Sequence, residues 1–528
     1  MPGVDIRHRP TDGGRQTWSR MARLRASACA LSLALFVGSF PAELRADTLS
    51  EALASAYEKN PRLDAERARL RATDEDVARA MSGYRPQVGV SAELGRASTH
   101  SRPGTSSDGN SGPWGYQISV SQPLFTGFRS TSTLNEAEAD VRAGRQTLRR
   151  VEAEVLLDAA AAYLDVIRDT AIVRIREKTV DVLSRELDAA RARRAAREVT
   201  LTDVAQAEAR RARALSEADR AKAELKVSRA RYQQVVGKQP MSLRAPPLKV
   251  KGMPRSLDEA LDIAHAESPN VQAALYREES SRHNVDKISG ELLPQVSVDA
   301  TWSQSGDTTG LYADEDDARV TGRVSMPLYE GGETRARIRQ AKHLHVSRLQ
   351  EIEQARNETE ANVTAAWSRL GAARAQLKSD EIQVEASRTA LEGVREEERV
   401  GQRLLLDVLN AEQEYLEAQV QAVVTKRNLV VASYAVLAEI GRLNGETVET
   451  GGLVYDPEVH YQGSRDEWFS TDITDRSGRD VEGEVLVDAE IAAEAEVGAP
   501  VIVEEPSARA RLRIPDEPPS LRLRSNKD

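Results

Sequence analysis

Hydrophobic positions recur along the chain with two different periods. The helical period of 3.6 residues covers six segments. These segments are 48–80, 130–197 and 201–236, followed by 256–290, 333–399 and 405–440, each to within a few residues. In the last segment Val408, Ala411, Tyr415, Ala418 and Ala422 form a narrow seam of small side chains, which is typical of closely packed coiled-coil helices.

The second period, a strict alternation, separates these helical segments. Val88, Val90, Ala92 and Leu94 alternate with polar residues, and similar runs surround Ile118, Val298 and Val324. Each run has about 9–11 residues, the length of a tilted strand that crosses a membrane. A soluble hairpin packed on a helix is the alternative interpretation. Four strands are too few to close a barrel, so a membrane sheet of this kind requires an oligomer.

The pattern occurs twice. The stretch TLSEALASAYEKNPRL at 48–63 recurs as SLDEALDIAHAESPNV at 256–271, 208 residues later. Pro123 and Pro327 are 204 residues apart. This period is too long for a solenoid unit and indicates a duplicated module. We predict a first module at 47–240, a linker at 241–255 and a second module at 256–445.

The helix lengths predict how each module is built. The first and last helices of a module hold about 34 residues each, and together they match the roughly 68 residues of the long helix. Two short helices stacked end to end would therefore lie along one long helix. Helices with so narrow an apolar seam must also pack laterally against copies of themselves.

Two corners join the strands to the long helices. Pro123 and Pro327 lack an N–H for a strand ladder and are predicted to end the sheet. Gly127 and Gly331 follow, and glycine permits the left-handed backbone that a sharp change of direction needs.

The N-terminus predicts export. Residues 21–25 form a basic segment, residues 26–40 are apolar, and Leu44-Arg45-Ala46 is the small-residue cleavage site. We interpret residues 1–46 as a signal peptide, with Met21 as the alternative start that would make the first 20 residues an extension. A buried helix is the alternative. The single cysteine, Cys29, stands at the start of the apolar run, where a lipidated cysteine does not occur. The mature chain would then contain neither disulfides nor thiolate metal sites.

Composition excludes several functions. The net charge of −10 argues against nucleic acid as a partner. No nucleophile elbow, phosphate loop or zinc spacing is present, so we expect no enzyme, no cofactor and no metal. Residues 446–528 are acidic and then basic, rich in proline and poor in hydrophobic residues, which predicts a disordered tail.

The chain resembles the TolC-type outer-membrane channels of secretion and drug efflux. The resemblance rests on the paired Pro-Leu-aromatic-x-Gly corners, the EALxxAxxxxP openings and the stretch VGQRLLLDVLNAEQEYLEAQ at 400–419. It implies a homotrimer with a twelve-stranded β-barrel in outer-membrane lipid and a twelve-helix periplasmic tunnel. It also implies a periplasmic adaptor and an inner-membrane pump, ABC-type or proton-driven. A periplasmic coiled-coil adaptor without a membrane barrel is the alternative function.

The resemblance also implies a gate at the periplasmic helix tips. The family's pair of acids matches Asp407 and Asn410, so the second acidic ring is polar but uncharged here. Arg403 matches the family's arginine, and Thr202 and Asp203 match its partners. Asp203 could instead cap its own helix, because Thr200 precedes it by three residues. Asp407 has no such Ser or Thr before it, which makes simple capping a weaker alternative there.

The tips themselves are the expected contact with the adaptor. Val400 and Gly401 lie at the second tip, and Arg197 occupies the position of Gly401 in the first copy. A tyrosine of the family's gate network is replaced here by Glu398.

Overall fold

The computed structural model describes residues 47–99, 109–307, 314–445, 454–471, 473–474 and 480–481. The predicted signal peptide at 1–46 lies outside the described residues. The chain divides into a unit that ends at Phe469 and a second unit that begins at Ser470. In the second unit, strands β7 (Ile473–Thr474) and β8 (Asp480–Val481) pair in antiparallel fashion.

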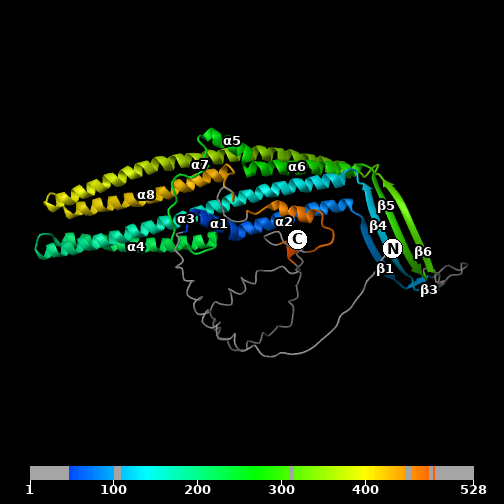
Figure 1. The fold of residues 1–528 in the computed structure, drawn as a ribbon, viewed down its shortest axis with the longest axis horizontal. Helices are drawn as coiled ribbons and strands as arrows, with labels where there is room; N and C mark the ends of the chain where they lie inside the picture. The colour runs from blue at the N-terminus through cyan, green and yellow to red at the C-terminus, as the bar shows by residue number, and fades with distance from the viewer. Residues whose placement is uncertain are drawn as a thin grey trace, which may run out of the picture. The chain divides into compact units, whose positions relative to one another are not determined.

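Eight helices build the two modules of the first unit, in the described part of the chain. In the first module they are α1 (Leu49–Lys59), α2 (Pro61–Met81), α3 (Arg129–Ala195) and α4 (Leu201–Val236). In the second module they are α5 (Leu257–Glu267), α6 (Pro269–Ser289), α7 (Glu333–Arg399) and α8 (Leu405–Glu439). The long helices α3 and α7 have 67 residues each, close to the predicted 130–197 and 333–399, and in both modules two long strands precede the long helix as predicted. Within each module the long helix packs against its short neighbours (Figure 1).

The opening helix of each module is broken, which corrects the prediction of single helices over 48–80 and 256–290. Asn60 and Ser268 adopt extended backbone, and a proline begins the next helix in both copies. The side chain of Asn60 accepts a hydrogen bond from the Arg62 N–H at 3.0 Å and so caps α2. Proline fits the first helical turn because its missing N–H has no partner there.

In both modules the break in the opening helix lies against the end of the module's last helix, and we call this contact the joint. Gly237 and Gly441 end α4 and α8 with left-handed backbone, at φ 80° and 79°. A Cβ atom on Gly237 would meet Lys59, and one on Gly441 would meet the carbonyl oxygen of Glu267. Lys59 and Glu267 are equivalent residues of the two modules, so the joint is part of the duplication.

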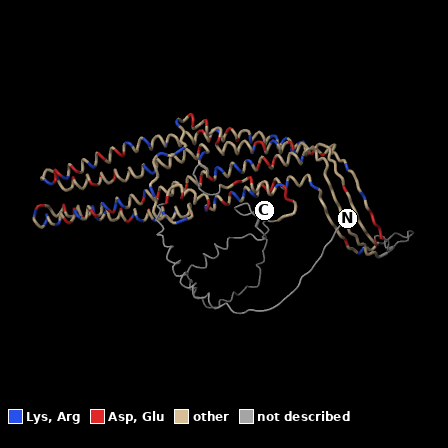
Figure 2. The backbone as a smooth tube through the Cα atoms, in the orientation of Figure 1, with Lys and Arg blue, Asp and Glu red and all other residues tan. Residues whose placement is uncertain are grey.

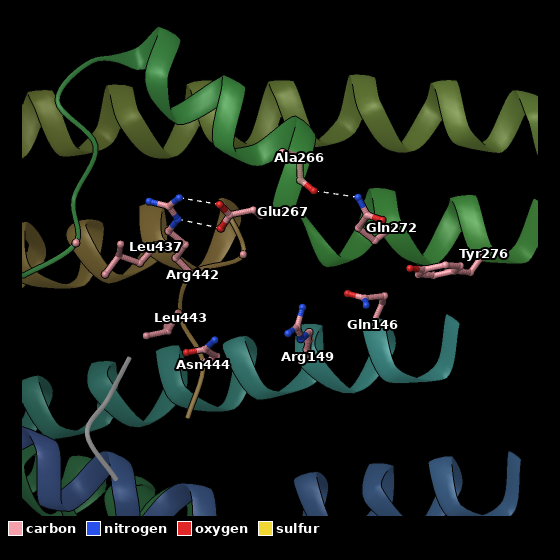
Figure 3. Close-up of a pocket in the computed structure, with 12 residues that line it drawn as sticks. Gln146, Arg149, Ala266, Glu267, Gln272, Tyr276, Leu437, Arg442, Leu443 and Asn444 are labelled. Atoms are coloured by element: carbon pink, nitrogen blue, oxygen red, sulfur yellow. Dashed lines mark hydrogen bonds and ion pairs between the residues drawn. The ribbon is translucent and has the colours of Figure 1, made fainter. Parts of the chain in front are cut away.

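A pocket of about 550 Å³ lies beside the second joint. Figure 3 shows Arg442 and Glu267 directed toward one another on one side of it, with Gln146 and Arg149 of α3 facing them. Arg442 donates two hydrogen bonds to Glu267, at 2.7 and 2.9 Å. The hydrogen bonds from Arg442 lower the pKa of Glu267. This bidentate ion pair fastens the end of α8 to the end of α5.

Four strands form one antiparallel sheet in the order β1-β4-β5-β6. They are β1 (Gln87–Leu94), β4 (Trp114–Phe125), β5 (Gln295–Gly306) and β6 (Asp314–Ser325). A separate short hairpin joins β2 (Ala97–Thr99) to β3 (Gly109–Ser111). Pro123 does not end the sheet as predicted: β4 continues to Phe125 through an irregularity between these residues. Pro123 still stands opposite Ser297, and Leu124 is the extra residue between the two registers, as in a β-bulge.

The C-terminal part of the first unit is ordered, which corrects the prediction of a tail disordered from residue 446. Helix α9 (Pro457–Arg465) packs on α2, and its buried His460 contacts Asp74 at 3.2 Å. Arg145 of α3 pairs with Glu458 at 2.7 Å. Residues 446–453 and most of those beyond 471 lie outside the described part.

Charged residues of both signs are interspersed along the helices (Figure 2). None of the described helices has a long enough apolar stretch to cross a membrane.

Candidate gate at the hairpin tips

The two helical hairpins end in turns of the same construction. Residues 196–200 join α3 to α4, and residues 400–404 join α7 to α8. Arg197 and Gly401 adopt left-handed backbone, at φ 64° and 77°. The next N–H reaches back five residues in both turns, from Glu198 to Arg193 at 2.9 Å and from Gln402 to Glu397 at 2.8 Å. This is a Schellman end, and it supports the equivalence of Arg197 and Gly401.

Asp203 caps its own helix. Its carboxylate accepts hydrogen bonds from the Thr200 N–H at 2.9 Å and the Thr200 hydroxyl at 2.7 Å. The Thr200 hydroxyl accepts in turn from the Asp203 N–H at 3.2 Å. The bonds from Thr200 lower the pKa of Asp203. Thr202, beside it, is exposed.

The expected Arg403–Asp203 pair is therefore not formed within one chain. The guanidinium of Arg403 pairs with Glu397 at 2.9 Å, on its own hairpin. Glu397 lies in the last turn of α7, so the pair closes the turn rather than joining two hairpins. A cap satisfies two backbone donors locally, whereas a link to the other hairpin must hold a long, exposed arginine in place.

Asp407 also caps its own helix, although capping is the weaker alternative from the sequence. Its carboxylate accepts the Leu404 N–H at 3.3 Å, at the start of α8. No Ser or Thr is needed at position 404, because a carboxylate in the first turn can reach back to the N-cap by itself. Asp407 remains partly exposed.

The two tips are joined by a contact that the sequence reasoning missed. Arg193 of α3 forms an ion pair with Glu398 of α7. The side chains are 39% and 16% exposed, so the pair is partly shielded from water. Bonding to Glu398 raises the pKa of Arg193. The sequence contains one indication of this contact. At the positions where the first copy has Arg193 and Arg194, the second copy has Glu397 and Glu398, so the two tips carry opposite charges.

A second link crosses from α4 to α8. Arg210 donates to the side-chain oxygen of Asn410 at 2.8 Å and also bonds Gln413. Both acceptors are neutral, so the bonds position the guanidinium without neutralising it. The polar residue at the expected second acidic ring thus holds a cation from the neighbouring helix.

Each hairpin also carries an internal ion pair at the same position. Arg191 pairs with Glu208 at 3.5 Å in the first, and Arg395 with Glu412 at 2.6 Å in the second. Burial raises the pKa of Glu412, an effect that Arg395 opposes. These pairs tie the two helices of one hairpin together, whereas the Arg193–Glu398 pair and the bonds from Arg210 join one hairpin to the other. No cluster of three potential metal ligands occurs among the residues that the structure describes.

Comparison with known proteins agrees with this architecture. The family model described as outer membrane efflux protein matches residues 52–238 and 260–442, which is most of both modules. The outer membrane efflux protein BepC of Brucella suis is 37% identical over 424 residues, covering 80% of this chain and 91% of that protein. The outer membrane protein TolC of Vibrio cholerae is 23% identical over 428 residues, covering 79% and 96%.

A solved structure supports the fold independently. The Campylobacter jejuni CmeC outer membrane channel superposes with a TM-score of 0.69 at 14% identity, covering 79% of this chain and 89% of that one. The family match includes both strand pairs, which decides against the alternative of an adaptor protein. The chain therefore belongs to the outer membrane efflux protein family, as an outer-membrane exit duct with a large periplasmic part that serves tripartite efflux or secretion.

Proposed function

We propose that the protein works as a homotrimer whose twelve strands close one β-barrel and whose helices continue it as a twelve-helix periplasmic tunnel. The main support for this proposal is that the four-stranded sheet has two unpaired edges in the part of one chain that the structure describes. Strands β1 and β6 each pair on one side only in the described chain. In lipid, every unpaired backbone group costs several kcal/mol, so both edges require partners. Three copies provide twelve strands, enough to enclose a duct.

The duct is passive and gated at the hairpin tips. The Arg193–Glu398 pair holds the two hairpins of one copy together, and Asp407 with Asn410 lines the constriction. Three copies would place rings of these residues around the axis, where fixed charge selects between anions and cations. Asp203 and Arg403 support the turns locally, and Thr202 is exposed beside Asp203. We expect no catalytic activity and no cofactor.

The tip turns are the contact surface for a periplasmic adaptor, which connects the duct to an inner-membrane pump of the ABC or proton-driven type. Val400 is 68% exposed, and Gly401 and Arg197 are exposed beside it. An exposed apolar residue at the end of a polar hairpin is suited to a protein partner. The module boundaries at 47–240 and 256–445, joined by 241–255, are part of the same proposal.

Two measurements on the purified protein test this function. Light scattering in detergent should give the mass of a trimer, and planar bilayers should show discrete ion conductance. A folded monomer without conductance would contradict both the assembly and the duct.

A further inference from the structure

We infer that strand β6 of one copy pairs with strand β1 of the next in a single register, with Arg323 opposite Glu93 and Val324 opposite Ala92. This inference rests on the proposed trimer and adds to it the identity of the residues that meet. It follows from the duplication. Within the chain, β4 of the first module pairs with β5 of the second, and a closed ring needs the equivalent pairing, which we call the seam, between copies.

Two fixed shifts relate the modules. Helix α2 and strand β1 correspond to α6 and β5 at a shift of 208 residues, since Pro61 matches Pro269. Strand β4 and helix α3 correspond to β6 and α7 at a shift of 204 residues, and α3 and α7 begin and end at equivalent positions.

The strand registers confirm these shifts. Gln87 pairs with Ser121 in the first module, and their equivalents Gln295 and Ser325 pair in the second. Residues that pair between β1 and β4 therefore have equivalents that pair between β5 and β6. The shifts derived from sequence motifs also describe the strand pairing.

The seam between the modules is the pairing of β4 with β5. There Ser119 lies opposite Thr301, and Val120 lies opposite Ala300. Shifting the β4 residues forward by 204 gives Arg323 and Val324 on β6. Shifting the β5 residues back by 208 gives Glu93 and Ala92 on β1 of the next copy.

The side chains agree with this register. Arg323 and Glu93 carry opposite charges and would be direct cross-strand partners, a favourable pairing. Val324 is 70% exposed in one copy and would meet the apolar face of β1. A slip of one residue would place Val324 opposite Glu93 or Ser91 and mix the two faces. A slip of two would leave Arg323 opposite Ser91 or Gly95.

The helices support the same seam. Between the modules, Arg277 of α6 donates to Thr147 of α3 at 3.3 Å. The same shifts bring Arg69 of α2 in one copy to Glu351 of α7 in the next. These residues again have opposite charges, and their side chains are 76% and 44% exposed in the single chain. Exposed, complementary groups at equivalent positions fit a contact between copies.

Disulfide trapping in the full chain with Cys29→Ser tests the register. Directly opposed strand residues have Cα atoms about 4.5–5.5 Å apart, within the range of a disulfide, whereas diagonal neighbours lie about 7–8 Å apart. Glu93→Cys combined with Arg323→Cys should give covalent dimers and trimers on non-reducing gels. The matched pairs, Glu93→Cys with Thr321→Cys or with Ser325→Cys, move the thiol by two residues on the same face and should give none.

The outcomes separate the register from the assembly. Cross-linking through position 321 or 325 instead of 323 would overturn the register. A trimer by light scattering in which all three pairs fail to cross-link would overturn the seam but leave the duct intact. A wild-type monomer would instead defeat the proposed function. Charge reversal gives a second readout: E93R should lower the yield of trimer, and adding R323E should restore part of it, because R323E also breaks the pair of Arg323 with Asp299 at 3.5 Å within the copy.

Discussion

Arg193 of α3 forms an ion pair with Glu398 of α7 and thereby joins the tips of the two hairpins. Partly exposed pairs contribute roughly 0.2–1 kcal/mol each, and three copies opening together would lose about three times that amount. We expect Arg193→Ala to raise the open probability of the pore in planar bilayers by about threefold or more.

The chain offers a matched control for this substitution. Arg395→Ala removes a pair of similar exposure, that with Glu412, whose side chains are 41% and 15% exposed and which lies within one hairpin. It should leave the open probability near the wild-type value, and so should Arg403→Ser, whose partner Glu397 also lies on its own hairpin. Equal effects of Arg193→Ala and Arg395→Ala would show that the contact between hairpins does not hold the gate closed.

The charge at the constriction gives a second prediction. Arg210 bonds Asn410 without being neutralised by it. Asn410→Asp would give Arg210 an anionic partner, so the added carboxylates would be paired and block by a trivalent lanthanide would tighten only modestly. Adding Arg210→Gln should leave six free acids with Asp407 and tighten the block by much more than either change alone.

Current block in planar bilayers, titrated with the lanthanide, measures this coupling. Asp407→Asn is the reference, because it removes the remaining acid and should abolish the block. Additive effects of the two substitutions would mean that Arg210 does not face the ions.

Much of the fold could be predicted from the sequence because the signals are strong and local. The bounds of α7 agree with the predicted 333–399, since unbroken helical periodicity is ended by glycines at both corners. The break at Asn60-Pro61 was also readable, as an asparagine cap followed by a proline at the first helical position. The same signal, Asp456-Pro457, begins α9 inside the predicted tail.

The partners at the tips could not be predicted in the same way. Whether Arg403 meets Asp203 or Glu397 depends on the direction of long side chains and on the rotation of one helix against another. Sequence spacing fixes neither of these. Local alternatives prevailed at Asp203 and Asp407, where a cap satisfies backbone donors without ordering a distant arginine.

The corner glycines should differ in the step that a substitution impairs. Gly127 and Gly331 both have left-handed backbone, at φ 67° and 64°. A Cβ atom on Gly127 would clash with the carbonyl oxygen of Gly290 and with Leu293, whereas one on Gly331 would meet nothing within 4 Å. Each alanine carries a strain of about 1–2 kcal/mol.

Gly127→Ala should therefore reduce the yield of folded chain, whereas Gly331→Ala should reduce assembly into the trimer, because the shifts of 204 and 208 residues bring Ser82 of the next copy to Gly331 as Gly290 lies against Gly127. Size-exclusion chromatography of membrane extracts measures both yields. A wild-type yield of trimer from Gly331→Ala would show that the next copy does not contact this corner as Gly290 contacts Gly127.

The cap at Asp203 predicts a dependence on pH. Its pKa is lowered in the folded chain by the bonds from Thr200, so the cap contributes stability above the usual pKa of the group, 3.8, and loses it as the pH falls through the lowered value. Amide hydrogen exchange in the first turn of α4 should stay slow down to about pH 4 and then accelerate, beyond the intrinsic change in exchange rate. Asp203→Asn should show faster exchange at neutral pH. An unchanged rate in this variant would show that the cap contributes nothing.

The docking of α9 depends on a buried pair. His460 contacts Asp74, whose side chain is fully buried, and Glu75 lies 3.6 Å from the other ring nitrogen. His460→Ala would leave the buried Asp74 carboxylate without this hydrogen-bond partner, at a cost of about 1–3 kcal/mol or more. We expect hydrogen exchange over residues 454–469 to accelerate strongly, as measured by mass spectrometry.

Gln462→Ala, on the exposed side of the same helix, controls for loss of a polar side chain and should change little. Adding Asp74→Asn to His460→Ala removes the stranded charge and should restore part of the protection. This restoration separates a charge effect from a cavity effect, because the cavity left by the imidazole is the same in both variants. If the double variant exchanges as fast as His460→Ala alone, packing of the ring holds α9 in place, and the contact with Asp74 does not.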